Sequence, residues 1–135
     1  MDRMKRIRAS GNLLHGELTR SVIGCAFDVI NELGHGFLES VYESAMIIAL
    51  EEAGISVESQ KPIDVSFRGR SIGNFYADLL VEEKVIVELK TASALAPEHS
   101  AQVINYLNAT GIQVGLLLNF GNPKLEYKRF TRTNP

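Results

Sequence analysis

The chain has 135 residues, a length that predicts a single domain able to bury roughly two-thirds of the surface that its unfolded form exposes. Its hydrophobic fraction of 45% and charged fraction of 22% are ordinary for a globular protein, and no apolar run approaches the roughly 20 residues needed to span a bilayer. The formal net charge of −2 argues against a strongly basic platform for nucleic acid.

The N-terminus is basic and has no apolar signal core behind it, which favours a flexible, solvated tail over residues 1–12 and a folded domain over residues 13–135. The charged residues of this tail are Arg3, Lys5, Arg6 and Arg8 against Asp2. A nucleic-acid-binding arm is the less favoured alternative. The single cysteine excludes an internal disulfide and a four-thiolate iron–sulfur site, and we expect a cytoplasmic location.

Two helices are predicted first, over residues 17–33 and 38–53, because apolar residues recur at helical spacing in both. In the first they are Leu18, Val22, Ala26, Val29 and Leu33, and in the second Leu38, Val41, Ala45, Ile48 and Ala49. Glycines at positions 34 and 54 end these helices, since the residue after a helix favours a left-handed conformation.

The period then becomes that of a strand, with alternation over residues 63–67. Further strands are predicted over residues 72–81, 85–91, 114–118 and 125–130. Pro97 is well placed to begin a third helix over residues 97–110, between the third and fourth strands. Such a helix implies a crossover connection, so we predict an α/β (α+β) fold with a mixed sheet flanked by helices.

The third strand carries Glu88 and Lys90 on one face, because residues two apart in a strand share a face. Such a charged face is predicted not to be buried. A three-residue loop over 82–84 places Asp78 opposite Glu88, whereas a two-residue loop would place it opposite Val87. We favour the first register because it also gathers the apolar residues Leu79, Val81, Val85, Val87 and Leu89 on the other face.

Two carboxylates at this separation suit a divalent metal, with Asp78 and Glu88 as ligands and the Leu89 carbonyl as a third. Such an ion lowers the pKa of a water and neutralises charge on a phosphate, and Lys90 would orient that water or stabilise the pentavalent phosphorus. The alternative is a solvated sheet face in which the same residues form cross-strand ion pairs.

Residues of two helices are further candidates for this site. Glu39 begins the second helix, where an acid usually serves the helix dipole. Gln102 and Tyr106 lie four residues apart and so share a face of the third helix, with His99 near it. Taken singly, the tyrosine is explained by packing at a rim and the histidine by a surface position.

Together these motifs resemble a known pattern. G-x-x-E-x-x-Y at Gly36, Glu39 and Tyr42 is similar to the signature of the bacterial GxxExxY family, which resembles the PD-(D/E)XK nuclease superfamily. The resemblance runs from about residue 17 to residue 130. It implies a restriction-endonuclease-like αβββαβ core with an extra N-terminal helix. One departure is Ala77, which stands where the superfamily motif has proline before Asp78.

The resemblance implies a nuclease that hydrolyses phosphodiester bonds with Mg²⁺ or Mn²⁺. Asp78, Glu88 and Lys90 would be catalytic, the metal would be held by Asp78, Glu88 and the Leu89 carbonyl, and Glu39 is a further candidate ligand at the mouth. Gln102 and Tyr106, with His99 as the weakest candidate, would contact the substrate. DNA is favoured over RNA, no membrane is involved, and a homodimer or a protein partner is compatible. The alternative is a non-catalytic nucleic-acid- or protein-binding module on the same fold.

Overall fold

The computed structural model describes residues 14–132, so the predicted basic tail lies outside the described residues. In chain order the elements are α2 (Gly16–Leu33), α3 (Glu39–Glu52), β1 (Val57–Phe67), β2 (Arg70–Val81), β3 (Val85–Lys90), α4 (Pro97–Thr110), β4 (Val114–Asn119) and β5 (Glu126–Thr131). All the predicted helices and strands are present. β1 begins at Val57 rather than at residue 63, because its polar first half pairs with β2 without any apolar alternation to announce it. Within residues 14–132, none of the helices combines the length and hydropathy of a membrane-spanning helix.

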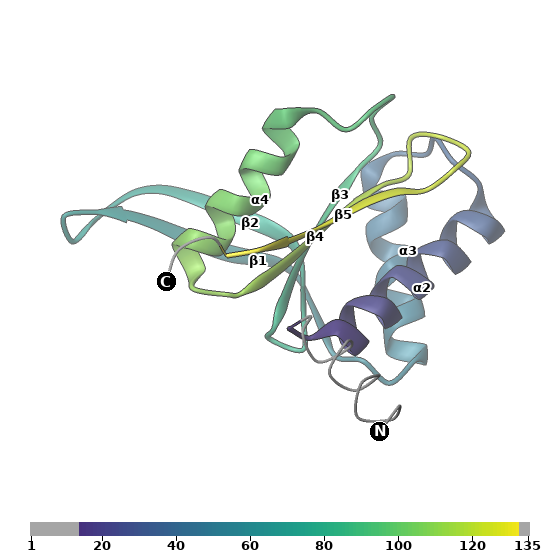
Figure 1. Cartoon of the computed structure of the whole chain (residues 1–135), viewed down its shortest axis with the longest axis horizontal. Coiled ribbons are helices and arrows are strands. Elements are labelled where there is room, and N and C mark those ends of the chain that lie inside the picture. Colours follow the sequence, from purple (N-terminus) through teal and green to yellow (C-terminus); the bar gives the residue numbers. More distant parts are fainter. Residues whose placement is uncertain (1–13, 133–135) are drawn as a thin grey trace, which may run out of the picture.

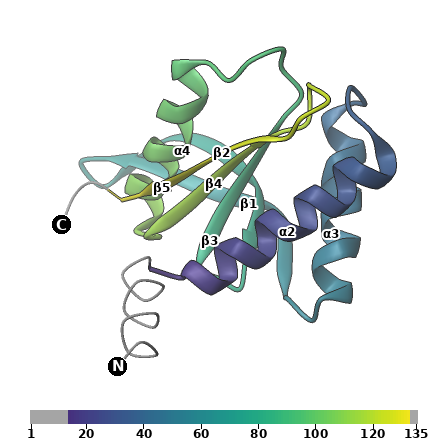
Figure 2. The ribbon, with the colours of Figure 1, turned by 45° about the vertical axis from the view of Figure 1, so that its right-hand side comes forward.

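The five strands form one sheet in the order β1-β2-β3-β4-β5. β3 and β4 are parallel, and the other neighbouring pairs are antiparallel. α4 is the crossover between the two parallel strands, as predicted from its place in the chain. Helices α2 and α3 lie on one side of the sheet and α4 on the other, as Figures 1 and 2 show. The predicted single domain with a mixed sheet flanked by helices is therefore confirmed.

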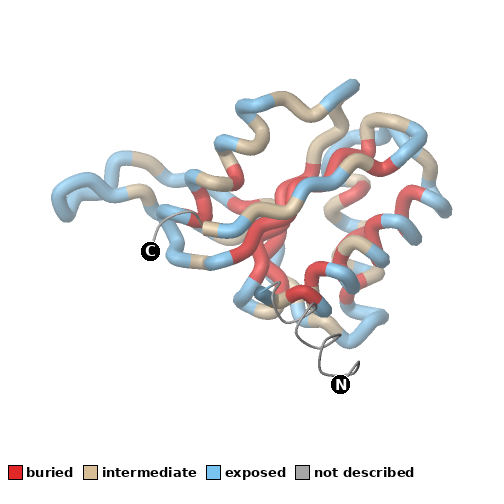
Figure 3. Tube along the Cα trace, viewed as in Figure 1, coloured by how far each residue is buried: buried red, intermediate tan, exposed pale blue. Residues whose placement is uncertain are grey.

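A hydrophobic core lies on each face of the sheet. The buried positions concentrate along the central strands, as Figure 3 shows. Val85, Val87 and Leu89 join the core under α2 and α3, as the alternation of β3 predicts. The opposite face was predicted to remain unburied, and this is wrong: Ile86 is 1% exposed and Glu88 is 3% exposed. The crossover helix α4 covers this face, a consequence of the topology that the local pattern of β3 does not contain.

The buried face of α3 differs from the predicted one. Tyr42, Met46 and Leu50 are fully buried, whereas Leu38 is 76% exposed and Ile48 is 58% exposed. The three buried residues are spaced four apart and face the sheet. The residues predicted to be buried lie on the neighbouring face of the helix, toward α2 and solvent. The tyrosine of the signature is therefore a core residue.

Gly115 sets how closely α4 packs on the sheet. A Cβ at this position would lie 2.6 Å from Cγ1 of Val103 on α4, closer than real Cβ contacts come. Because a β-branched side chain on a helix has little freedom to move away, the helix itself would have to shift. The absence of a side chain at Gly115 therefore allows α4 to pack closely on β4.

We expect Gly115→Ala to destabilise the protein by about 1–3 kcal/mol through overpacking, measured by urea unfolding. The matched control is Gly24→Ala, since Gly24 lies in the exposed middle of α2 with nothing near its Cβ position. That change should stabilise the protein by about 0.5–1 kcal/mol through helix propensity. Equal stability of the Gly115 variant and the wild type would show that α4 does not pack so closely.

Candidate active site

Asp78 and Glu88 interlock where β2 and β3 part. The backbone pairs between these strands are Val81↔Val85, Leu80↔Ile86 and Leu79↔Val87, which confirms the predicted register. At the next position, Asp78 and Glu88, carboxylate oxygens accept the backbone N–H groups in place of carbonyls of the other strand. The N–H of Asp78 donates to Oε2 of Glu88 at 2.8 Å, and the N–H of Leu89 donates to Oδ2 of Asp78 at 2.8 Å. Each carboxylate thus binds the backbone of the other strand.

Burial makes this carboxylate pair hard to ionise. Burial first, and the neighbouring Asp78 second, raise the pKa of Glu88 to about 8. Burial also raises the pKa of Asp78, although the N–H of Leu89 and the charge of Lys90 act in the opposite direction. A buried carboxylate beside a half-buried one is stabilised by a cation, and carboxylate oxygens are the ligands that Mg²⁺ prefers. The donor set therefore fits a hard divalent metal.

Lys90 and Glu39 border the pair. Lys90 ends β3, and its charge lowers the pKa values of Glu39, Asp78 and Glu88. Glu39 is the first residue of α3, and burial raises its pKa, followed by smaller effects of Lys90, which lowers it, and of Asp78, which raises it. Among residues 14–132, no three acidic, histidine or cysteine side chains gather closely enough to hold a metal. Glu39 therefore stands beside the pair without completing a ligand shell.

Helix α4 brings two predicted residues to the same place. Nε2 of Gln102 donates to the hydroxyl of Tyr106 at 3.1 Å. Tyr106 is 7% exposed, and burial raises its pKa, with Glu88 adding to the rise. The hydroxyl therefore lies near the carboxylate pair and keeps its proton. His99 lies one turn earlier and uses Nδ1 to accept the N–H of Ala96 at 3.0 Å, which caps the helix.

Gly36 and Tyr42 of the signature position Glu39. Gly36 adopts a φ of 90° and donates its N–H to the carbonyl of Phe120 at 3.1 Å. The ring of Tyr42 stacks on that of Phe120, with centroids 4.4 Å apart. Its hydroxyl donates to the carbonyl of Gly34 at 2.7 Å and accepts the N–H of Phe37 at 3.2 Å. The loop before α3 is thereby fixed to the end of β4, which directs the start of α3 toward the carboxylate pair.

Asn119 is a site-supporting residue that the sequence analysis missed. It is fully buried at the end of β4. Its Oδ1 accepts the N–H groups of Ala92 at 2.9 Å and Gly121 at 3.1 Å, and its Nδ2 donates to the carbonyl of Ala92 at 2.9 Å and to Glu126 at 2.8 Å. These bonds hold the chain that leaves Lys90. An amide directly after an otherwise apolar strand was the one signal available.

Gln60 on β1 was also missed. It adopts a φ of 51°, an uncommon conformation for a residue with a side chain, and it lowers the pKa of Asp78. Its Nε2 donates to Oε1 of Glu43 on α3 at 2.6 Å. Such unusual backbone conformations gather at functional sites, and here one accompanies the bend of the strands at Asp78.

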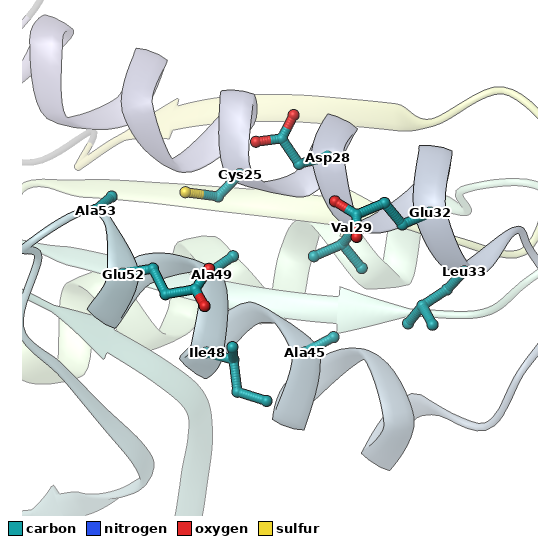
Figure 4. A pocket seen from close by; sticks show the side chains of 10 residues that line it. All are labelled: Cys25, Asp28, Val29, Glu32, Leu33, Ala45, Ile48, Ala49, Glu52 and Ala53. Carbon is teal, nitrogen blue, oxygen red and sulfur yellow. The ribbon is translucent and has the colours of Figure 1, made fainter.

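A hollow between α2 and α3 lies apart from the Asp78–Glu88 site (Figure 4). Its volume is about 420 Å³, and Leu33, predicted to be buried, lines it at 42% exposed. Three carboxylates line it as well: Asp28, Glu32 and Glu52. Burial, and then the charge of Asp28, raise the pKa of the Cys25 thiol there. A thiol with a raised pKa is a weaker nucleophile at neutral pH.

Comparisons with known proteins agree with the fold. A model of the PD-(D/E)XK nuclease superfamily matches residues 16–130, a span that includes every predicted site residue. The crystal structure of SSO0001 is similar to this chain with a TM-score of 0.54 and 13% sequence identity, a likeness of fold alone. The match covers 98% of this chain and 64% of that one, so this chain spans less than two-thirds of its length. Both findings agree with a restriction-endonuclease-like fold. No curated protein matches the chain.

Replacing Asn119 with alanine should destabilise the protein by about 2–4 kcal/mol, because the half-buried N–H and carbonyl of Ala92 would lose their partners at a fully buried side chain. The control is Asn122→Ala, which removes bonds to Ser93 and Glu126 at a more exposed position and should cost less than about 1 kcal/mol. Chemical unfolding measures both changes. Equal losses would show that Asn119 has no special part in holding the end of β3.

Metal-free protein should lose stability as the pH rises from 4.5 to about 8, because folded Glu88 keeps a proton that the unfolded chain has released. The folded state binds more protons in this range, so the unfolding free energy falls with pH, by up to about 1.4 kcal/mol per pH unit for one group. Urea unfolding in EDTA between pH 5 and 9 measures the slope. Glu88→Gln should flatten it, whereas the exposed control Glu98→Gln should leave it unchanged; parallel curves for all three proteins would contradict the expectation.

Proposed function

The chain belongs to the PD-(D/E)XK nuclease superfamily, and on that premise we propose that it is a divalent-metal-dependent nuclease acting at Asp78, Glu88 and Lys90. The observation that supports this most strongly is the interlocked pair formed by the half-buried Asp78 and the buried Glu88, with Lys90 two residues further along β3. The match to Gly36, Glu39 and Tyr42 further supports membership of the GxxExxY branch.

The metal would be held by Asp78, Glu88 and the carbonyl of Leu89. When bound, Mg²⁺ or Mn²⁺ supplies charge neutralisation at the phosphate and a lower pKa for the attacking water. Both carboxylates would have to be ionised to hold the ion, so Glu88 would give its proton to the solvent. The interlocking backbone bonds keep the two side chains oriented before the metal arrives, which reduces the reorganisation that binding needs.

The remaining side chains would act on the phosphodiester. Lys90 would orient the attacking water or stabilise the negative charge that develops on the phosphoryl oxygens. The Tyr106 hydroxyl, kept protonated by its surroundings and oriented by Gln102, would donate to a phosphate oxygen of the substrate strand. Glu39 would bind a water at the mouth, because it is close enough for the charges of Lys90 and Asp78 to act on it but does not gather with the pair into a three-residue ligand group.

The test is cleavage of single- and double-stranded DNA and RNA with Mg²⁺ or Mn²⁺. Lys90→Ala should lower cleavage by about 100-fold or more, because one charge-stabilising group is lost from the transition state. The matched control is Lys84→Ala, which removes an exposed lysine from the β2–β3 loop of the same hairpin and should change nothing.

Two further outcomes separate the alternatives. Mn²⁺ should raise the melting temperature of the wild type and not that of Asp78→Asn, which lacks one ligand charge. If no substrate is cut with any metal, the enzyme proposal is wrong, and salt-sensitive binding without cleavage would then support a non-catalytic nucleic-acid-binding module.

A further inference from the structure

Strands β1 and β2 continue beyond the rest of the sheet as a two-stranded arm, defined here as residues 62–76. β2 pairs with β3 only over residues 79–81, whereas its pairing with β1 runs on to Phe67↔Arg70. The arm projects from the body of the molecule, and its tip is exposed (Figures 1 and 3). Four of its large apolar side chains are exposed, namely Phe67, Ile72, Phe75 and Tyr76. Phe75 and Tyr76 are adjacent in the strand and so lie on opposite faces of the arm, which leaves exposed aromatic surface on both faces.

A groove lies between this arm and α4. Its volume is about 620 Å³, within the range of roughly 300–1,000 Å³ typical of ligand sites. Val65 and Phe75 line it from the arm, and Gln102, Asn105 and Tyr106 line it from α4. Tyr106, which lines the groove and bonds to Gln102, is also close enough to Glu88 and Asp78 for their charges to act on its hydroxyl, so the groove lies beside the candidate active site.

Phe75 forms an aromatic platform in this groove. A Cβ at Gly73 would lie 2.8 Å from Cε2 of Phe75, so the ring lies over the glycine and depends on its lack of a side chain. The ring is 45% exposed and lies 6.3 Å from that of Tyr106, tilted by 45°. Two aromatic rings therefore line the groove close to the catalytic groups, and one keeps part of its surface open.

The turn of the arm carries two arginines, while the groove itself is lined, among the residues that the structure describes, by one acid, Glu98, and no base. Arg68 and Arg70 flank the turn, and the guanidinium of Arg68 lies 4.9 Å from the centroid of Phe67. The acid of the arm, Asp64, accepts hydrogen bonds from Ser71 at 2.6 Å and Ser66 at 3.4 Å, which occupy its oxygens. Arginine beside aromatic rings is the combination with which proteins bind the backbone and the unstacked bases of single strands.

We infer that the groove between the arm and α4 binds an unpaired nucleic-acid strand, whose bases stack on Phe75 while its backbone enters the carboxylate site. A duplex hides the faces of its bases within the stack and has no ring surface to offer this platform. The inference rests on the proposed nuclease function and adds to it the substrate class: single strands, or unpaired ends of duplexes.

The experiment measures binding of a labelled 12-nucleotide single strand and of its duplex by fluorescence anisotropy in EDTA, where cleavage cannot occur. Wild type should bind the single strand more tightly than the duplex. Phe75→Leu keeps apolar bulk against Tyr106 but removes the ring, and Phe75→Ala removes both. Each should weaken single-strand binding by about fivefold or more, the expected loss for one stacked base.

Tyr76→Ala is the matched control. Tyr76 is the adjacent residue and 54% exposed, and successive strand residues point to opposite faces, so it lies away from the groove. Binding by this variant should equal that of the wild type. Equal losses in the Phe75 and Tyr76 variants would overturn the groove assignment, because they would report on the arm as a whole.

Other results would overturn the inference while leaving the nuclease proposal to its own test. Equal affinity for single strand and duplex, or an unchanged affinity in Phe75→Leu, would do so. So would sedimentation showing that Phe75→Leu dissociates a dimer while single-strand binding persists, since the groove would then be a protein interface. Hydrolysis of bis(p-nitrophenyl) phosphate by the wild type with Mn²⁺ decides the nuclease chemistry separately, because this small ester has no strand to occupy the groove.

Discussion

The end of β3 is joined to the loop before α3 through the backbone of Phe120, and the candidate site depends on this junction. The N–H of Phe120 donates to the carbonyl of Lys90 at 2.8 Å, while its own carbonyl accepts the N–H of Gly36. One residue thus links the strand that ends in the lysine to the loop that leads into Glu39. The stacked ring of Tyr42 and the bonds of Asn119 surround this link and exclude water from it. The spacing between lysine and glutamate is therefore set by core packing rather than by flexible surface loops.

The divergence of β2 from β3 produces both the carboxylate site and the groove beside the arm. Near the loop that joins them, β2 and β3 pair regularly, over Leu79–Val81 and Val85–Val87. Farther from the loop, β2 pairs only with β1 and β3 pairs only with β4. The backbone groups freed at the fork are bound by Asp78 and Glu88. Both Ala77 and Leu80 face the core under α4, so regular alternation fails between them and β2 twists at the acid. In a regular sheet, the carboxylates of Asp78 and Glu88 would not bond to the backbone of the other strand, and the arm would have no free face.

The sequence predicted correctly the features that neighbouring residues determine, and it missed those that depend on distant segments. The register of Asp78 and Glu88 followed from the apolar pairs around Val81 and Val85, because a one-residue slip would expose them. The burial of Glu88 was missed because the helix that covers it begins seven residues after Lys90 and reaches it only through the fold. The buried row of α3 was misassigned because its apolar residues lie on several sides, and only contact with the sheet selects Tyr42, Met46 and Leu50. Asn119 was missed since its partners, Ala92 and Glu126, lie on other segments.

The fold does not require charged side chains at positions 78 and 88. The two bound N–H groups, of Asp78 and Leu89, need acceptors, and the amide oxygens of asparagine and glutamine would serve as well. Amides would also avoid the repulsion and the burial that raise the pKa of Glu88 to about 8. A chain that used this fold only as a scaffold would be more stable without those charges, since an unpaired buried charge destabilises a protein. A cation bound to the folded protein would offset their repulsion and stabilise the charged form, which is what the proposed metal site requires.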